Sequence, residues 1–194
     1  MDTIILASSS PRRKELLTQL IGSNFMAKES AYKENNTLDM KPVDLVSYHS
    51  SNKAKDIKNT FNMGIIISAD TIVVHKNKVI GKPKNEDDAI KILKNISGNE
   101  IEVITGLTVI DVNNNKEINE SETTKVKIKE LTDEEIKDYV DTGEPLDKAG
   151  AFGIQGKGAI LVEKIDGCYS NVVGLPLFRL SKILRKLGIN IFKI

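Results

Sequence analysis

The sequence predicts an α/β fold in which a mixed β-sheet is flanked by helices. Two observations carry this prediction. Short apolar runs alternate along the chain with segments of helical periodicity, and a long β-hairpin pattern occupies the middle of the chain. The length of 194 residues is that of one globular domain with at most an added lobe, and we take residues 1–194 as that domain.

Strands are predicted where apolar and β-branched residues are concentrated, and helices where apolar residues recur every three or four positions. The predicted strands lie at residues 4–7, 64–69 continued by 71–74, 79–80, 101–112, 124–129 and 159–162. The predicted helices lie at residues 11–21, 43–57, 86–97, 132–139 and 176–187. Between them, residues 28–41 are polar and predict a loop or an irregular strand.

Local capping signals support the helix boundaries. Ser10 is suited to the N-cap and Pro11 to the first turn of the first helix, while Asn85 precedes three acidic residues that suit the positive end of a helix dipole. Residues 132–135, Thr-Asp-Glu-Glu, have the pattern of a capping box.

The composition excludes several classes of protein. The 28 Lys and Arg nearly balance the 27 Asp and Glu, so no overall field favours a long polyanion, and no stable nucleic-acid complex is expected. Cys168 with His49 and His75 cannot supply an ordinary zinc site. The apolar run near the N-terminus is too short for a signal peptide or a membrane span, so a cytoplasmic protein is expected.

The start of the first helix has the composition of a phosphate site. Residues 8–14 combine three serine hydroxyls, the free N–H groups of a helix N-terminus and the cations Arg12, Arg13 and Lys14. Cations in a first turn oppose the helix dipole, so their presence needs a reason. The alternative is that Ser10 only caps the helix while Arg12 and Arg13 are solvated.

Asp70 interrupts an apolar strand, where an unpaired carboxylate is costly. Its chemistry suits a Mg²⁺ ligand or a general base, and Glu29 and Glu34 are candidates for a second carboxylate. The alternative is an aspartate at a bulge or strand end that is hydrogen-bonded to the backbone. Lys53 and Lys82 could each reach a phosphate, although most lysines are surface residues.

Six of the 13 glycines fall between residues 143 and 167, a density that permits close backbone approach to a ligand or simply forms a flexible loop. The segment matches neither a P-loop nor a dinucleotide-binding motif. Within it, the amide of Gln155 could pair with a base edge, because it both donates and accepts hydrogen bonds. Cys168 is interpreted as a small, inert core residue.

Taken together, these segments resemble the Maf family of nucleoside triphosphate pyrophosphatases over nearly the whole chain. The matching segments are LASSSPRR at residues 6–13, ADT at 69–71, GKP at 81–83, SG at 97–98, TG at 105–106, EPLDKAGAFGIQG at 144–156 and VGLPL at 173–177. The resemblance implies a Maf/ITPase-like fold with a curved sheet and two lobes around an active-site cleft.

The resemblance also implies an enzyme that requires Mg²⁺ or Mn²⁺ and hydrolyses dTTP, UTP and modified pyrimidine triphosphates to the monophosphate and pyrophosphate. By position, Asp70 is the proton acceptor or metal ligand and Glu34 its metal partner, with Glu29 still open. Ser8, Arg12, Arg13, Lys53 and Lys82 handle phosphates, with Lys82 counted among the catalytic residues. Arg12, Thr71 and Gln155 match positions tied to substrate choice.

This chain departs from the family pattern at four positions, which are Lys33, Asn52, Ser68 and Phe152. Relatives suggest a homodimer. The rival hypothesis is a non-catalytic nucleotide- or nucleic-acid-binding regulator of cell division and septum formation that uses the same anion site without turnover.

Overall fold

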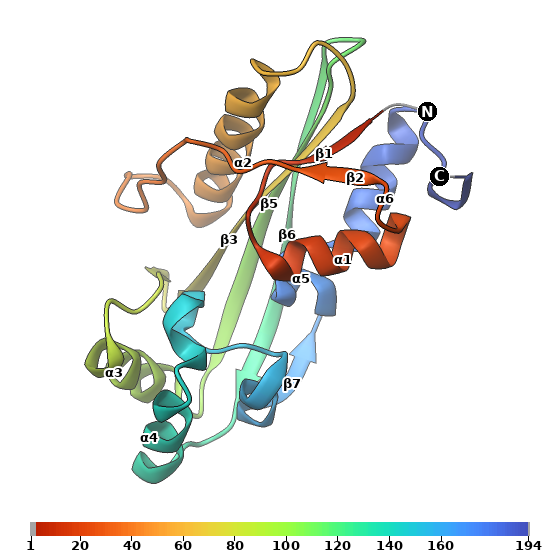
Figure 1. The fold of residues 1–194 in the computed structure, drawn as a ribbon. Helices are drawn as coiled ribbons and strands as arrows, with labels where there is room; N and C mark the ends of the chain where they lie inside the picture. Colours follow the sequence, from red (N-terminus) through yellow and green to blue (C-terminus); the bar gives the residue numbers. More distant parts are fainter. Residues whose placement is uncertain (1–2, 194) are drawn as a thin grey trace. The chain divides into compact units, whose positions relative to one another are not determined.

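A computed structural model describes residues 3–193 and shows a mixed seven-stranded β-sheet within them (Figure 1). The sheet order is β2-β1-β3-β5-β6-β7, and β4 pairs with β3. β1 is parallel to β2 and β3, whereas the β3–β4 and β6–β7 pairs are antiparallel. The strands are β1 (Ile4–Leu6), β2 (Phe25–Ala27), β3 (Ile65–His75), β4 (Lys78–Ile80), β5 (Glu100–Asp111), β6 (Lys116–Ile128) and β7 (Val162–Asp166).

The α-helices other than α5 follow the predicted positions closely. They are α1 (Pro11–Ile21), α2 (Pro42–Lys58), α3 (Glu86–Ile96), α4 (Asp133–Asp141), α5 (Tyr169–Val173) and α6 (Leu177–Lys186). Short 3₁₀ helices are η1 (Glu144–Asp147), η2 (Ala149–Ala151), η3 (Gly156–Leu161) and η4 (Ile191–Lys193). The predicted α/β class with helices flanking a mixed sheet is therefore confirmed.

The predicted caps are present as hydrogen bonds. The Ser10 hydroxyl accepts from the backbone N–H of Arg13 at 3.4 Å, and the Asn85 side chain accepts from that of Asp88 at 2.9 Å. Thr132 and Glu135 form the reciprocal capping box at the start of α4. These helix starts depend on side chains within one turn of the boundary, which is why the sequence alone predicts them.

The described residues divide into two compact units. The first contains residues 3–70, 105–122 and 174–193, and the second contains residues 71–104 and 123–173. Asp70 is therefore the last residue of β3 in the first unit, and Thr71 begins the second. The two lobes and cleft implied by the family resemblance stay a prediction.

The first unit packs helices on both faces of its part of the sheet. Figure 1 shows α2 on one side and α1 with α6 on the other. Apolar residues of β1, β3 and β5 form a core with α2; its buried members are Ile5, Ala7, Ala54, Ile57, Ile66 and Ile110.

Close packing and polar contacts fix α2 against the sheet. A side chain on Gly106 of β5 would meet the Val46 carbonyl oxygen at 2.2 Å, so only glycine permits this approach. Asn119 donates to the Ser47 carbonyl at 2.8 Å and to the Thr108 hydroxyl at 2.7 Å. Ser50 shares a further buried hydrogen bond with Thr108 at 2.9 Å.

The second unit has its own apolar core, in which α3 and α4 pack together. The buried members include Val73, Leu93, Val126, Ile136 and Phe152. In its glycine-rich segment, the Glu144 carboxylate accepts from the backbone N–H groups of Lys157 and Gly158, both at 3.0 Å.

These contacts correct the prediction that residues 159–162 form a strand. Residues 156–161 form η3 instead, and β7 begins only at Val162. Glu144 holds the backbone at the start of this turn, and Ile160 is 74% exposed, so the apolar run is not a buried strand. The short elements β2 and α5 were not predicted, because three and five residues are too few to show a period.

In the part of the chain that the structure describes, no helix is long and apolar enough to cross a membrane.

Candidate active site

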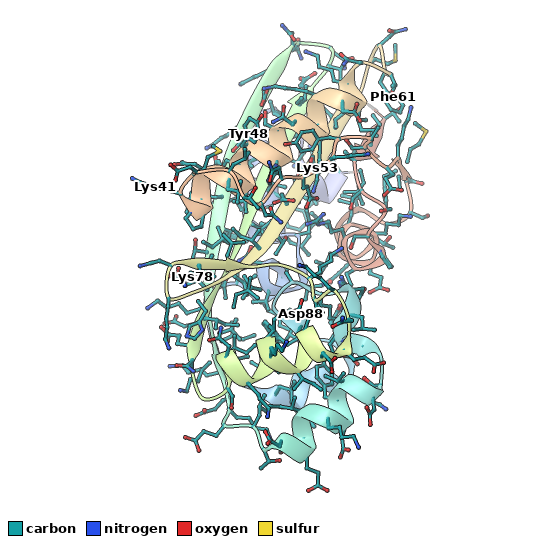
Figure 2. All side chains as sticks on the ribbon, turned by 90° about the vertical axis from the view of Figure 1, so that its left-hand side faces the viewer. Lys41, Tyr48, Lys53, Phe61, Lys78 and Asp88 are labelled. Carbon is teal, nitrogen blue, oxygen red and sulfur yellow. The ribbon has the colours of Figure 1, made fainter. Side chains whose placement is uncertain are left out.

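An ion-pair cluster in the first unit joins three of the predicted site residues, of which Lys53 and Asp70 are buried and Glu34 is exposed. Asp70, which is 3% exposed on β3, accepts from Lys53 Nζ through its Oδ1 atom at 2.7 Å. The same ammonium forms an ion pair with Glu34, which lies in the loop before α2. Figure 2 shows Lys53 on α2, the helix that also carries Tyr48. The structure thus brings Glu34, Lys53 and Asp70 together.

The electrostatics of the two carboxyl groups differ. Burial raises the pKa of Asp70 above its ordinary value, and although Lys53 opposes this shift, the negative charge of Glu34 adds to it. Burial also acts to raise the pKa of Glu34, but the charge and hydrogen bond of Lys53 outweigh it and hold that pKa below its ordinary value. Asp70 is therefore the stronger base of the pair.

One carboxylate oxygen of Asp70 makes no hydrogen bond within the described part of the chain. Its Oδ2 atom is buried and has no hydrogen-bond partner among residues 3–193. A buried carboxylate oxygen without a partner is costly and needs an explanation. The alternative in which Asp70 is satisfied by backbone hydrogen bonds does not account for this atom.

Arg13, at the start of α1, is a second positive charge that acts on Asp70 and Glu34, in addition to Lys53. Arg13 Nε donates to the Gly174 carbonyl at 2.8 Å, and its Nη1 atom donates to the Ser8 hydroxyl at 3.5 Å. Burial lowers the pKa of the Arg13 guanidinium, while the negative charges of Asp70 and Glu34 act in the opposite direction. Arg12 and Arg13 are both half-buried, so they are not simply solvated cations.

The two candidates for the second carboxylate are separated by their contacts. Glu29 is exposed and accepts from the Ser9 hydroxyl at 3.0 Å, whereas Glu34 shares the Lys53 ammonium with Asp70. Glu34 is therefore the carboxylate that the structure associates with Asp70.

The remaining predicted residues lie in the second unit. Thr71 follows Asp70 directly in β3 and is half-buried. Lys82 is exposed between β4 and α3, and Gln155 is half-buried just before η3. Within this unit the backbone N–H of Gly150 donates to the Gly81 carbonyl at 3.0 Å, which joins the Lys82 turn to the glycine-rich segment.

The donor set of the cluster fits a divalent cation that also binds phosphates. Mg²⁺ is commonly held by one or two carboxylates together with substrate phosphates, and the unpaired Oδ2 atom of Asp70 is a suitable ligand. Residues 3–193 contain no group of three or more His, Cys, Asp or Glu side chains that could hold a metal. A metal here would therefore need ligands from the substrate or from water.

Three residues next to this cluster were missed by sequence reasoning. Tyr32 and Asp56 were not singled out, and His49 was considered only as one of too few ligands for a zinc site. His49 is wholly buried, and its Nδ1 atom shares a hydrogen bond with the Tyr32 hydroxyl at 2.9 Å. The available signal was the spacing of His49, Lys53 and Asp56, which places them on one face of α2.

The fold is similar to that of a solved structure. It matches a HAM1 protein from Coxiella burnetii with a TM-score of 0.54 at 12% identity, over 96% of this chain and 100% of that chain. This similarity concerns the fold alone.

Sequence comparisons define the family. A protein named dTTP/UTP pyrophosphatase from Methanosarcina barkeri is 55% identical over 100% of this chain and 98% of its own length. One of the same name from Acetivibrio thermocellus is 49% identical over 100% of this chain and 99% of its own length. The model of the Maf-like protein family matches residues 3–187, and the chain belongs to this family.

Proposed function

We propose that this protein is a nucleoside triphosphate pyrophosphatase that acts on dTTP, UTP and modified pyrimidine triphosphates and so removes unwanted nucleotides. The observation that carries the proposal is the unpaired, buried Oδ2 atom of Asp70 within a cluster of two carboxylates and an ammonium. The names of the relatives support the choice of dTTP and UTP as substrates.

In the proposed reaction, a water molecule attacks the α-phosphorus. The water oxygen forms the new bond to phosphorus, the bond from that phosphorus to the oxygen bridging the α- and β-phosphates breaks, and pyrophosphate leaves. Two roles are open to Oδ2 of Asp70, which can accept the proton of the water or bind a metal ion. Its raised pKa suits the first role, since a general base works best when its pKa is close to the working pH.

A Mg²⁺ or Mn²⁺ ion would be held by Asp70 and Glu34. When bound, it would neutralise phosphate charge and act as a Lewis acid.

The other residues position the triphosphate. Ser8 and Arg13 lie together at the N-terminal end of α1, where backbone N–H groups and a fixed guanidinium suit phosphate oxygens. We assign phosphate contacts also to Arg12, Lys53 and Lys82, with Arg12, Arg13 and Lys82 stabilising the pyrophosphate that leaves. We assign Thr71 and Gln155 to the choice of base.

We further propose that the protein works in the cytoplasm as a homodimer and forms no stable complex with nucleic acid. The near balance of 28 basic and 27 acidic residues supports the last point, since a long polyanion gains little from a neutral field. Light scattering in solution tests the dimer.

A turnover assay tests the proposed activity. The protein is incubated with dTTP or UTP and Mg²⁺, and pyrophosphate is measured before and after addition of EDTA. We expect Asp70→Asn to lower kcat by about 10²- to 10⁴-fold, the usual contribution of a general base. Asp111→Asn is the matched control, because Asp111 is also a buried aspartate of the first unit but pairs with Asn114.

If the wild-type protein and Asp70→Asn both bind nucleotide without releasing pyrophosphate, the enzyme hypothesis is wrong and the rival regulator is favoured. Release of orthophosphate would indicate a different phosphohydrolase.

A further inference from the structure

Glu34 lies in a segment that has no regular secondary structure to hold it. Residues 28–41 contain neither helix nor strand, yet the Glu34 carboxylate meets Lys53 and shares that ammonium with Asp70. A carboxylate that acts in a site must be held within a fraction of an ångström of its working position. Because no helix or strand fixes this segment, side-chain contacts must hold Glu34 in position.

One face of α2 provides these contacts. His49, Lys53 and Asp56 follow each other at intervals of four and three residues, so they are neighbours along one side of the helix. Each binds a different residue of the loop between residues 30 and 34. We call this set of contacts the α2 clamp.

Asp56 holds the beginning of the segment. Its Oδ2 atom accepts from the Ser30 hydroxyl at 2.8 Å and from the backbone N–H of Ala31 at 2.7 Å. Two donors on one carboxylate oxygen fix both a side chain and the backbone three residues before Glu34.

Tyr32 and His49 hold the middle of the segment. The Tyr32 hydroxyl and His49 Nδ1 are 2.9 Å apart, and the two rings are tilted at a centroid distance of 5.7 Å. His49 is wholly buried, and its Nε2 atom has no hydrogen-bond partner among residues 3–193. Tyr32 therefore supplies the hydrogen bond of a buried imidazole, two residues before Glu34.

The helix that carries these residues, α2, is packed closely against the sheet. Gly106 allows α2 to touch β5, and Asn119 donates to the Ser47 carbonyl on α2 at 2.8 Å. Asp70 lies on β3 of the same unit. The position of Glu34 relative to Asp70 is thus set through α2.

We propose that Tyr32, His49 and Asp56 are positioning residues that hold Glu34 in place for metal and triphosphate binding. This inference rests on the proposed function. It assigns no contact with substrate to these residues, since they act only through Glu34.

Matched tyrosine variants test the inference. Tyr32→Phe removes the hydroxyl that pairs with His49. Tyr48→Phe is the control, because the Tyr48 ring also lies against His49, at a centroid distance of 5.8 Å, while Tyr48 is 44% exposed. Asp56→Asn is the second test variant, since it weakens the hold on Ser30 and Ala31.

Three measurements are made on each variant, and these are hydrogen exchange of residues 28–41, Mn²⁺ affinity by electron paramagnetic resonance, and kcat with KM for dTTP. We expect faster exchange at residues 30–34 in Tyr32→Phe and Asp56→Asn. We expect Mn²⁺ affinity or kcat/KM to fall about 10-fold, the lower end of what residues that orient metal ligands contribute. Tyr48→Phe should match the wild type.

Unchanged exchange and Mn²⁺ affinity in both test variants would overturn the clamp. So would equal effects of Tyr32→Phe and Tyr48→Phe, because the hydrogen bond between Tyr32 and His49 would then contribute nothing beyond what the loss of any neighbouring hydroxyl does. If the wild type releases no pyrophosphate, the proposed function fails by itself, while exchange and Mn²⁺ affinity still decide whether the clamp exists.

Discussion

Lys53 and Asp70 form a buried ion pair in which Nζ lies 2.7 Å from Oδ1, and the same ammonium also pairs with Glu34. One positive charge is thus shared by two carboxylates that would otherwise repel each other. Lys53 is 9% exposed and Asp70 3%, so water screens this pair only weakly. The lysine therefore offsets part of the negative charge of the two carboxylates.

Replacing this lysine should unbalance the cluster. We expect Lys53→Met to lower the free energy of unfolding by about 3–5 kcal/mol in metal-free buffer, because it leaves the buried Asp70 carboxylate without its counter-charge. Mn²⁺ should restore part of the loss by binding the same carboxylates. Urea unfolding with and without Mn²⁺ measures both effects.

Lys55→Met is the control for this prediction. Lys55 lies on the same helix and pairs with Glu117 at 3.5 Å, but its side chain is 56% exposed. An exposed pair contributes only about 0–1 kcal/mol. Equal losses of stability in the two variants would show that the ion pairs of Lys53 contribute no more to the free energy of unfolding than an exposed ion pair does.

The close approach of α2 to β5 gives a second prediction. Gly106→Ala would place a side-chain carbon 2.2 Å from the Val46 carbonyl oxygen, and a backbone atom cannot move aside cheaply. We expect a loss of about 1–3 kcal/mol in the free energy of unfolding, as for other overpacked sites. Gly81→Ala, which meets nothing within 4 Å, should have little effect on the same urea curves.

The hold of Glu144 on the glycine-rich segment should depend on pH. Burial acts to raise the Glu144 pKa, but hydrogen bonds from the backbone of Gly158 and Lys157 and from the Tyr139 hydroxyl hold it below its ordinary value. A carboxylate whose pKa is lower in the folded state stabilises that state above its unfolded pKa of about 4.3. The stabilisation is lost as the pH falls through the folded pKa.

Urea unfolding of Glu144→Gln from pH 7 to pH 3 checks this dependence. We expect the variant to be less stable than the wild type at pH 7 and the difference to shrink in acid. Glu163→Gln, at an exposed position on β7, should show no such trend. A stability difference that stays constant with pH would contradict the prediction.

The guanidinium geometry at the start of α1 gives a fourth prediction. Arg13→Lys keeps the positive charge but cannot donate to both Gly174 and Ser8 as the fork of Arg13 does. We expect kcat/KM for dTTP to fall about 10- to 100-fold, as for lost hydrogen bonds of a charged group. Arg185→Lys, on the exposed side of α6, serves as control, and equal kinetics in the two variants would count against the assignment.

Some of the fold could be predicted because its causes are local. Ser10 and Pro11 begin α1 through contacts within a single turn, and Thr132 with Glu135 does the same for α4. The prediction failed at residues 159–161, where an apolar run forms η3 and not a strand. Its backbone is held at the start by Glu144, a partner more than ten residues away along the chain.

The candidate site divides in the same way. Asp70 could be identified from the sequence, because a lone carboxylate in an apolar strand is costly and therefore informative. Glu34 and Glu29 could not be separated, since both lie in an irregular polar loop. Tyr32, His49 and Asp56 could not be predicted as part of the site. Their roles depend on hydrogen bonds between residues that are far apart in the sequence.

The sequence by itself determined the fold class, most helix starts, the family resemblance and the anomaly at Asp70, since periodicity, capping and burial patterns are local properties. Only the tertiary structure decided that Glu34 and not Glu29 shares the Lys53 ammonium with Asp70, and that side chains of α2 contact the loop between residues 30 and 34. These facts depend on groups far apart in the chain, and distance between side chains, not spacing in sequence, sets the strength of a hydrogen bond or an ion pair.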